Sequence, residues 1–294
     1  MRFEFMRNHA EEFCIKEMAK ILGVCRTGYY EFLKRKIGKR SMENQRLIGK
    51  IKEIHQNSRG TYGSPRVHRE LKNRGEKYSR KRIARLMQSN KIQAKMRKKW
   101  KVTTCRASKT TAIVAPNHLD QNFVTEAPNK TWVSDITYVA TQEGWLYVAV
   151  VMDLFSRKIV GLSMGDRLET DLVLKALKQA LFHRNIKEGL MHHSDRGSQY
   201  TSEEFKELAS MHGIKLSMSA KGCCYDNAVA ESFFHTLKTE HIHLCGYKIR
   251  EEAKNSIFEY IEVFYNRKRL HSTIGYRSPE DFENYWGSRS QNVV

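Results

Sequence analysis

The sequence predicts an α/β domain with a mixed β-sheet, preceded by an all-α region of helix-turn-helix type. From about residue 123, three consecutive strand-like runs are followed by alternating helices and strands, the order of a mixed sheet flanked by helices. Residues 1–110 contain helical patterns and hold 31 of the 52 basic residues but only 9 of the 32 acidic ones. This asymmetry indicates an electrostatic binding region joined to a near-neutral domain, and it favours nucleic acid as the partner.

The N-terminal region is expected to form two helix pairs with one further helix between them. The expected helices span residues 11–22, 26–34, 42–57, 64–73 and 79–90. Ser64-Pro65 and Ser79 are helix-start signals. A plain helical hairpin would explain either pair alone, but two pairs on the basic part of the chain favour DNA contact. Helix 79–90 carries three basic residues away from its apolar face, and these are candidate DNA contacts: Lys81, Arg82 and Arg85.

Residues 91–110 hold eight basic residues and no acidic one, with Trp100 among them. An extended arm that neutralises phosphates would have this composition, and Trp100 could stack on a base. A solvated linker with Trp100 packed against a domain fits almost as well. On the first interpretation the DNA contacts are Lys98, Lys99, Trp100 and Lys101.

The second half of the chain has the element order of a ribonuclease-H-like domain. Strands are expected over residues 131–140, 145–153, 158–164, 190–195 and 214–218, with a turn at Glu143-Gly144. Helices are expected over residues 169–184, 203–212, 227–242 and 250–269. The predicted domains are therefore two helix-turn-helix regions, a basic linker, this α/β core and a tail, at residues 1–40, 41–92, 93–122, 123–285 and 286–294.

Several classes of protein are excluded by composition. The longest apolar run, Trp145 to Met152, has eight residues, far fewer than the ~20 of a membrane-spanning helix. The N-terminus has early acidic residues and no apolar core of a secretory signal. The six cysteines include no pair at C-x-x-C spacing, which fits a reducing compartment. We therefore expect a cytoplasmic protein without a membrane partner.

Three carboxylates stand where local structure does not favour them. Asp135 lies inside a strand, Asp195 ends another, and Glu231 is in the first turns of a helix. Each has an ordinary alternative: a buried ion pair, a turn before Gly197, or a helix-dipole interaction. Their spacing weakens these alternatives, because 59 residues separate the two aspartates and 35 separate Asp195 from Glu231. This Asp, Asp, 35, Glu spacing is typical of transposases and retroviral integrases.

The local sequences match as well, over nearly the whole chain. They include YGSPRVHREL, SRKRIARLM, WVSDITYVAT, HHSDRGSQYTS, DNAVAESFFHTLKTE and YNRKRLHSTIGYRSPEDF. The chain resembles the OrfB-type transposase of the IS-three family of bacterial insertion sequences. The resemblance implies an integrase core whose Asp135, Asp195 and Glu231 are catalytic and hold two divalent ions, Mg²⁺ or Mn²⁺. No His/Cys cluster is required, so His241, His243 and Cys245 are interpreted as a helix end.

The resemblance also implies DNA contacts outside the triad. Lys238 and Asn227 share the helix face of Glu231. Lys238 lies two turns beyond it, ~10.5 Å along the helix, and a solvated lysine is the alternative. The closing motif suggests packing and DNA contact by Arg267, Arg269 and His271. Asp153 is interpreted as a turn residue that could pair with Arg157.

The expected partners are the terminal inverted repeats of an insertion element and target DNA, with the chain acting as a homo-oligomer at the bacterial nucleoid. Family members generally act as a fusion with an upstream product, OrfA, that supplies a leucine zipper, and this chain shows no zipper pattern. The leading hypothesis is a transposase that cleaves element ends and joins the 3′-hydroxyl to another strand. An unfused DNA-binding regulator and a ribonuclease or resolvase are the alternatives. The intact triad favours an enzyme, and the basic helical region disfavours a simple ribonuclease.

Overall fold

A computed structural model of the chain describes residues 1–34, 38–95, 114–186, 188–220 and 224–291. The candidate DNA contacts Lys98, Lys99, Trp100 and Lys101 lie outside the described residues. The chain divides into two compact units, Met1–Glu53 and Ile54–Val294, which we describe separately.

The first unit contains three short helices and most of a longer one: α1 (Arg2–Asn8), α2 (Ile15–Ile21), α3 (Arg26–Lys34) and the greater part of α4 (Lys39–Asn57). Its small core consists of Met6, Met18, Ala19 and Tyr29. Gly23 adopts a left-handed φ of 61° in the turn between α2 and α3, a conformation that favours glycine. Helix α3 has the predicted bounds. Helix α1 was not predicted, since only Met6 of its seven residues is buried and its apolar periodicity is weak.

The second unit begins with the helix pair α5 (Ser64–Asn73) and α6 (Arg80–Ser89). Ser79 caps α6 as predicted, its hydroxyl accepting from the Arg82 backbone N–H at 3.3 Å. The predicted N-cap at Ser64 is wrong by one residue: Gly63 is the N-cap, and Ser64 lies within the first turn beside the proline.

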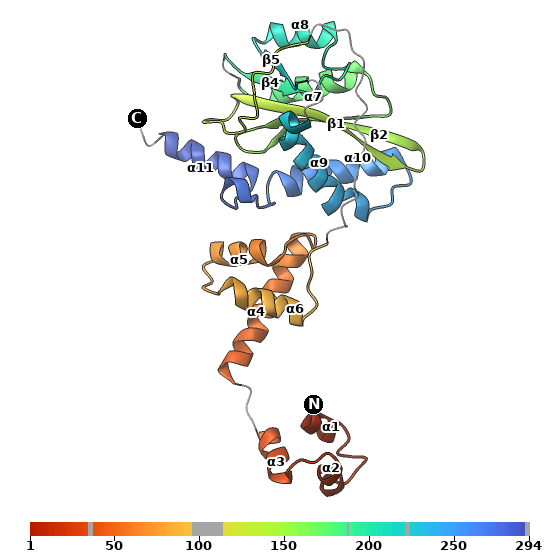
Figure 1. Cartoon of the computed structure of the whole chain (residues 1–294), viewed down its shortest axis with the longest axis vertical. Helices are drawn as coiled ribbons and strands as arrows, with labels where there is room; N and C mark the ends of the chain where they lie inside the picture. The colour runs from red at the N-terminus through yellow and green to blue at the C-terminus, as the bar shows by residue number, and fades with distance from the viewer. Residues whose placement is uncertain (35–37, 96–113, 187, 221–223, 292–294) are drawn as a thin grey trace. The chain divides into compact units, whose positions relative to one another are not determined.

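A five-stranded mixed sheet with the strand order β3-β2-β1-β4-β5 follows (Figure 1). The strands are β1 (Thr131–Thr141), β2 (Gly144–Asp153), β3 (Ile159–Gly165), β4 (Met191–Ser194) and β5 (Lys215–Met218). The first three strands pair antiparallel, whereas β4 joins β1 in parallel and β5 joins β4 in parallel. This order and these bounds agree closely with the predicted elements.

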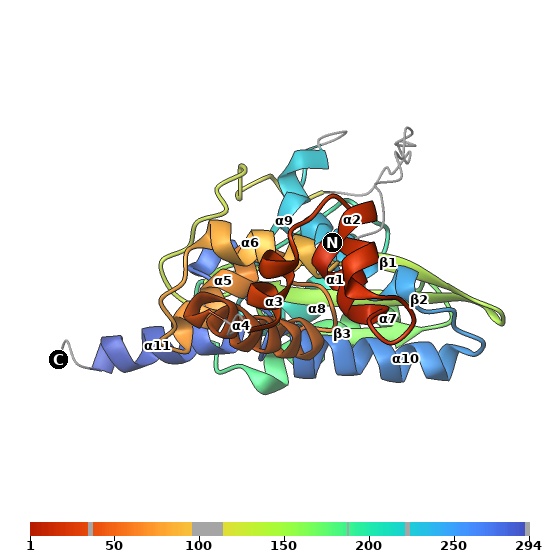
Figure 2. The same cartoon turned by 90° about the horizontal axis from the view of Figure 1, so that it is seen from below.

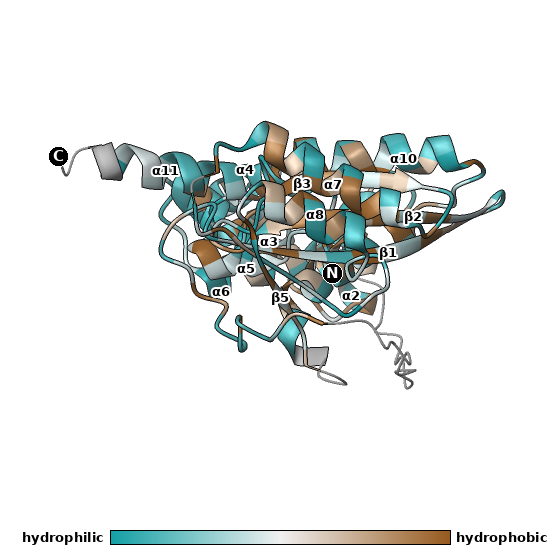
Figure 3. Cartoon of the chain, turned by 90° about the horizontal axis from the view of Figure 1, so that it is seen from above, coloured by the Kyte–Doolittle hydropathy of each residue, from teal (hydrophilic) through white to brown (hydrophobic). Residues whose placement is uncertain are grey.

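Helices α7 (Thr170–His183) and α8 (Glu203–Met211) pack on the apolar core of the sheet. Trp132, Val151 and Leu177 are among its buried residues. The apolar colouring is concentrated on the strands and on α7 (Figure 3). Strand β3 approaches α7 so closely that a Cβ on Gly161 would meet the Ala176 carbonyl oxygen at 2.1 Å, so glycine is required there.

The C-terminal part packs against β1 and β2 through two of its helices, α9 (Ala228–Glu240) and α10 (Arg250–Glu259) (Figure 2). It consists of η1 (Cys224–Asn227), α9 (Ala228–Glu240), η2 (Ile242–Leu244), α10 (Arg250–Glu259), η3 (Tyr260–Tyr265), η4 (Ser272–Ile274) and α11 (Pro279–Gln291). The helix predicted over 250–269 is α-helical only to Glu259 and continues as the π-helical segment η3. Helix α11 was not predicted. In the described part of the chain, no helix is both long and apolar enough to cross a membrane.

Candidate active site

Asp135 and Asp195 are brought together by the pairing of two parallel strands. Val133 of β1 lies opposite His193 of β4. Extending this register by two residues places Asp195, directly after β4, beside Asp135. Asp135 is partly buried, and its Oδ1 accepts from the Ile136 backbone N–H at 2.8 Å.

Asp195 is exposed and shapes the turn that follows β4. Its Oδ1 accepts from the Gly197 backbone N–H at 3.0 Å. Asp195 therefore forms the turn before Gly197 that was its alternative role, and it also lies beside Asp135. The turn fixes one carboxylate oxygen and leaves the other for a ligand.

Glu231 reaches the same region from the first turn of α9. The helix start is fastened to the sheet, because Asn227 Nδ2 donates to the Ser134 carbonyl at 3.1 Å, one residue before Asp135. Glu231 lies one turn beyond Asn227 and is exposed. The structure thus brings the three predicted carboxylates into one region, from two strands and a helix.

The three carboxylates share one electrostatic field. Burial, followed by the charges of Asp195 and Glu231, raises the pKa of Asp135 to about 7, while Lys238 opposes the rise. Burial also raises the pKa of Glu231. Within the described ranges, no three His, Cys, Asp or Glu side chains converge closely enough to enclose a metal ion. An all-oxygen set with excess negative charge nevertheless has the chemistry that a hard divalent cation prefers.

Lys238 occupies the flank of this cluster. Its Nζ lies 4.8 Å from the centre of the Tyr138 ring. Burial lowers the pKa of its ammonium, and the nearby Asp135 carboxylate raises it. Lys238 is therefore a half-buried cation held between the carboxylates and an aromatic ring.

Two buried histidines beside the carboxylates have a structural role that the sequence did not reveal. His192 Nε2 lies 2.7 Å from Ser134 Oγ, and His193 Nδ1 lies 2.9 Å from Ser217 Oγ. Burial lowers the pKa of His192 to about 3 and that of His193 to about 4, so both rings are neutral near pH 7. Each ring joins its strand to a serine of a neighbouring strand.

Asp226, which was also not predicted, organises the segment before α9. Its carboxylate accepts from Asn117 Nδ2 at 2.9 Å, Gln121 Nε2 at 3.0 Å and the Ala220 backbone N–H at 2.8 Å. Residues 115–123, with the sequence APNHLDQNF, thus connect the start of the core domain to the residues that precede Glu231. The polar residues of this segment had no role predicted from the sequence.

The predicted DNA contacts outside the triad fall into two groups. Lys81 and Arg85 are exposed on α6, and Arg82 lies over the Tyr78 ring at 5.2 Å. Arg267 is exposed and lies 3.6 Å from Glu280. These positions are compatible with DNA contact.

The second group does not fit the expected role. Arg269 is only 4% exposed, and its Nε and Nη2 each donate to Glu240 at 2.7 Å. His271 packs against this guanidinium, and Asn227 is buried at the helix start. The prediction that Arg269 and Asn227 contact DNA is therefore replaced by structural roles, since neither side chain is accessible.

The structure also places the residues for which the sequence predicts roles outside catalysis. Asp153 is fully buried at the end of β2 and accepts from the backbone N–H groups of Asn129 and Phe155 at 2.7 and 2.9 Å. Arg157 donates from its backbone to the Asp153 carbonyl, not from its side chain to the carboxylate. His241 bonds Ser256 at 2.8 Å, and Cys245 is exposed.

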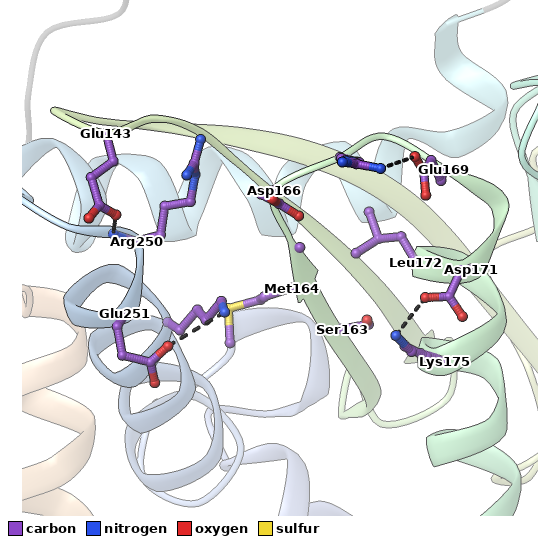
Figure 4. A pocket seen from close by; sticks show the side chains of 13 residues that line it. Glu143, Ser163, Met164, Asp166, Glu169, Asp171, Leu172, Lys175, Arg250 and Glu251 are labelled. Carbon is purple, nitrogen blue, oxygen red and sulfur yellow. Dashed lines mark hydrogen bonds and ion pairs between the residues drawn. The ribbon is translucent and has the colours of Figure 1, made fainter.

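A cavity of about 520 Å³ lies away from the carboxylates, beside β3 and the start of α7 (Figure 4). Its charged side chains pair with one another, as in Lys175–Asp171 and Lys254–Glu251. It shares no residue with the carboxylate cluster.

Comparison with known proteins places this architecture in a class. Residues 125–224 and 231–285 match two family models described as integrase core domain, and residues 42–100 match an HTH-like domain. The chain is therefore an integrase-type DNA recombination enzyme with a helix-turn-helix-like domain ahead of its catalytic core.

Individual relatives narrow this assignment. The chain is 41% identical over 286 residues to the transposase InsF for insertion sequence IS3A of Escherichia coli, covering 97% of this chain and 99% of the relative. It is 44% identical over 265 residues to the insertion element IS600 uncharacterized 31 kDa protein of Shigella sonnei, covering 90% and 97%. The chain belongs to the IS3 family of transposases, and it acts on DNA.

Two solved structures align with parts of this chain at TM-scores below 0.5. The catalytic core domain of HTLV-2 integrase in complex with magnesium aligns with a TM-score of 0.41 and 18% identity, covering 53% of this chain and 97% of that one. A simian T-cell lymphotropic virus intasome aligns with a TM-score of 0.46 and 13% identity, covering 79% and 73%.

Proposed function

We propose that Asp135, Asp195 and Glu231 hold two divalent cations, Mg²⁺ or Mn²⁺, and that the chain cleaves insertion-element ends and joins the freed 3′-hydroxyl to target DNA. The observation that carries this proposal is the placement of the three carboxylates in one region, from β1, the end of β4 and α9, where the charges of Asp195 and Glu231 act on Asp135. When bound, two such ions stabilise the attacking and leaving oxygens of an in-line displacement at phosphorus. Their ligands would be these carboxylates together with water and DNA phosphate oxygens.

The protein side chains have distinct tasks in this proposal. Asp135 must be ionised to bind a cation, and its raised pKa means that bound cations and protons compete for it near neutral pH. Lys238 supplies a half-buried positive charge for a phosphate close to the scissile bond. Lys81 and Arg85 on α6 would hold the duplex through its backbone, which gives binding a steep salt dependence.

Assembly belongs to the same proposal. Both ends of an element must be cut and joined, so we expect a homo-oligomer on DNA, with or without an OrfA-type partner that contributes further DNA recognition. A chain that acts on chromosomal DNA would be found at the nucleoid.

The test is incubation of the full chain with labelled duplex DNA copied from the borders of the element that encodes it, with and without Mg²⁺. Nicked and joined products are expected from the wild-type chain. Asp135→Asn, Asp195→Asn and Glu231→Gln should each abolish both products while retaining fold and DNA binding. Near-normal strand transfer by any one of them would refute the triad. Binding without cleavage by the wild-type chain would instead favour the regulator.

A further inference from the structure

The β1–β2 hairpin projects beyond the other strands (Figure 1). It carries two exposed aromatic side chains. Strand β4 pairs with β1 only at residues 131–133, so the later part of β1 is paired only with β2. Tyr138 and Trp145 lie on this extension, 57% and 50% exposed. Their rings meet edge to face, with centroids 5.1 Å apart and planes at 85°. We call this pair the aromatic shelf.

The shelf adjoins the carboxylate cluster. Tyr138 follows Asp135 by three residues on the same strand, so their Cα atoms are ~10 Å apart and their side chains leave opposite faces of the strand. Lys238 Nζ lies over the Tyr138 ring and within the electrostatic field of Asp135. A cation thus stands between the place of the chemistry and the exposed rings.

The hairpin that bears the shelf is held in place. Arg250 at the start of α10 donates from Nε to the Trp145 carbonyl at 3.1 Å and from its backbone to Glu143 at 2.7 Å. The Gln142 backbone N–H donates to the Tyr247 carbonyl at 3.2 Å. Gly144 has a φ of 117°, and a Cβ there would meet Arg250 Nη2 at 2.9 Å. A platform fixed in this way loses little conformational entropy when a ligand binds.

We propose that the aromatic shelf of Tyr138 and Trp145 is a binding site for a nucleobase of the DNA end, unstacked next to the scissile phosphate, while Lys238 contacts the backbone between base and phosphate. Every base has a π-face, so stacking on such rings is tolerant of sequence. The ~10 Å between the two Cα atoms is the length of about three steps along one DNA strand at 3.4 Å per step. We therefore look for the stacked base among the three nucleotides beside the cleavage point. This inference rests on the proposed function.

The test uses the full chain and border DNA with 2-aminopurine at each of those three positions in turn, in the absence of divalent metal so that no cleavage occurs. Stacking on the shelf should quench the fluorescence of one position. Tyr138→Ala and Trp145→Ala should weaken this quenched complex about 5- to 150-fold, the range equivalent to the ~1–3 kcal/mol of one base–aromatic stack. Tyr138→Phe and Trp145→Phe keep a ring and should restore it.

Two controls separate the shelf from general effects. Phe182→Ala removes another exposed aromatic side chain, 87% exposed on α7, and should leave the quenching unchanged. An abasic nucleotide at the quenched position should weaken wild-type binding to the level of Tyr138→Ala and weaken the variant no further. Equal quenching by wild type and both alanine variants would overturn the inference, as would full additivity of the abasic and alanine effects. Because the measurement needs no cleavage, a wild-type chain that quenches but does not cut would refute the proposed reaction and leave the shelf supported.

Discussion

A buried ion pair at the end of α9 offers a sharp test of how the active-site helix is held. Glu240 ends α9, nine residues after Glu231, and is almost fully buried. It accepts two hydrogen bonds at 2.7 Å from Arg269, one from Tyr260 at 3.0 Å and one from Arg66 of α5 at 3.3 Å. These donors keep the pKa of Glu240 below its ordinary value despite burial. The test replaces either Glu240 or Arg269 with alanine.

Removing one partner of a buried ion pair costs ~3–5 kcal/mol of unfolding free energy. Arg269→Ala should lie at the lower end, because Glu240 keeps Tyr260 and Arg66 as donors. Glu240→Ala should lie at the upper end of this range. The carboxylate accepts two hydrogen bonds from the buried Arg269 guanidinium, and without it this buried charge would be left beside His271. For a unit of this size, ~2–4 °C per kcal/mol gives a fall in Tm of ~6–20 °C.

The assay is urea unfolding of the full chain, followed in the transition that belongs to residues 54–294. Asp171→Ala is the matched control: it breaks an ion pair with Lys175 that is largely exposed, and it should cost less than ~1 kcal/mol. The double variant Glu240→Leu with Arg269→Met should be more stable than the sum of the single losses implies, because no buried charge remains. A loss below ~1 kcal/mol for Glu240→Ala would refute this account.

Three further outcomes are expected. The pKa of Asp135 rises from 3.8 to about 7 on folding, so the metal-free fold loses stability as the pH rises through this interval. At about pH 8, the free energy of unfolding of Asp135→Asn in a urea titration should exceed that of wild type by up to ~4 kcal/mol. Near pH 4 this difference should vanish. Lys238→Ala should reduce cleavage of border DNA in an assay across a salt series, whereas Lys238→Arg should retain most of it. If both variants cleaved at the wild-type rate at every salt concentration, Lys238 would be a surface lysine without a role in cleavage. Lys81→Ala and Arg85→Ala should each lower DNA affinity and reduce the slope of log affinity against log salt by about 1 in a titration, and an unchanged slope would remove α6 from the interface.

Much of the catalytic half could be predicted from the sequence, because its elements have regular patterns and clear ends. The five strands and helices α7 and α8 lie within a residue or two of their predicted bounds. The positions of Asp135 and Asp195 follow from strand order alone, since parallel neighbours place equivalent residues side by side. Glu231 was assigned to the triad from the motif spacing. The apolar periodicity of its helix does not show where that helix packs against the sheet.

The errors arose where side-chain direction depends on non-standard backbone. The π-helical turn η3 is marked by i→i+5 bonds from Asn266 to Ile261 at 2.9 Å and from Arg269 to Phe264 at 2.8 Å. Arg269 follows this segment and is buried against Glu240. The closing motif had suggested a DNA contact for Arg269, and the motif alone gave no sign of this burial. Nothing in the spacing of single residues marks such a turn.

Helix α9 connects these results, because it is held at three points that have different chemistry. Asn227 fastens its start to β1, Lys238 lies over the Tyr138 ring near its last turn, and Glu240 anchors its end to Arg269. A change at the end should therefore be felt at Glu231, even though it lies about 13 Å away along the helix axis. Loss of the Glu240 anchor should lower cleavage and stability together, whereas loss of Glu231 should remove cleavage alone. If a destabilised Glu240→Gln chain, kept below its unfolding temperature, cleaved border DNA at the wild-type rate, the end of α9 would have no part in positioning the carboxylate.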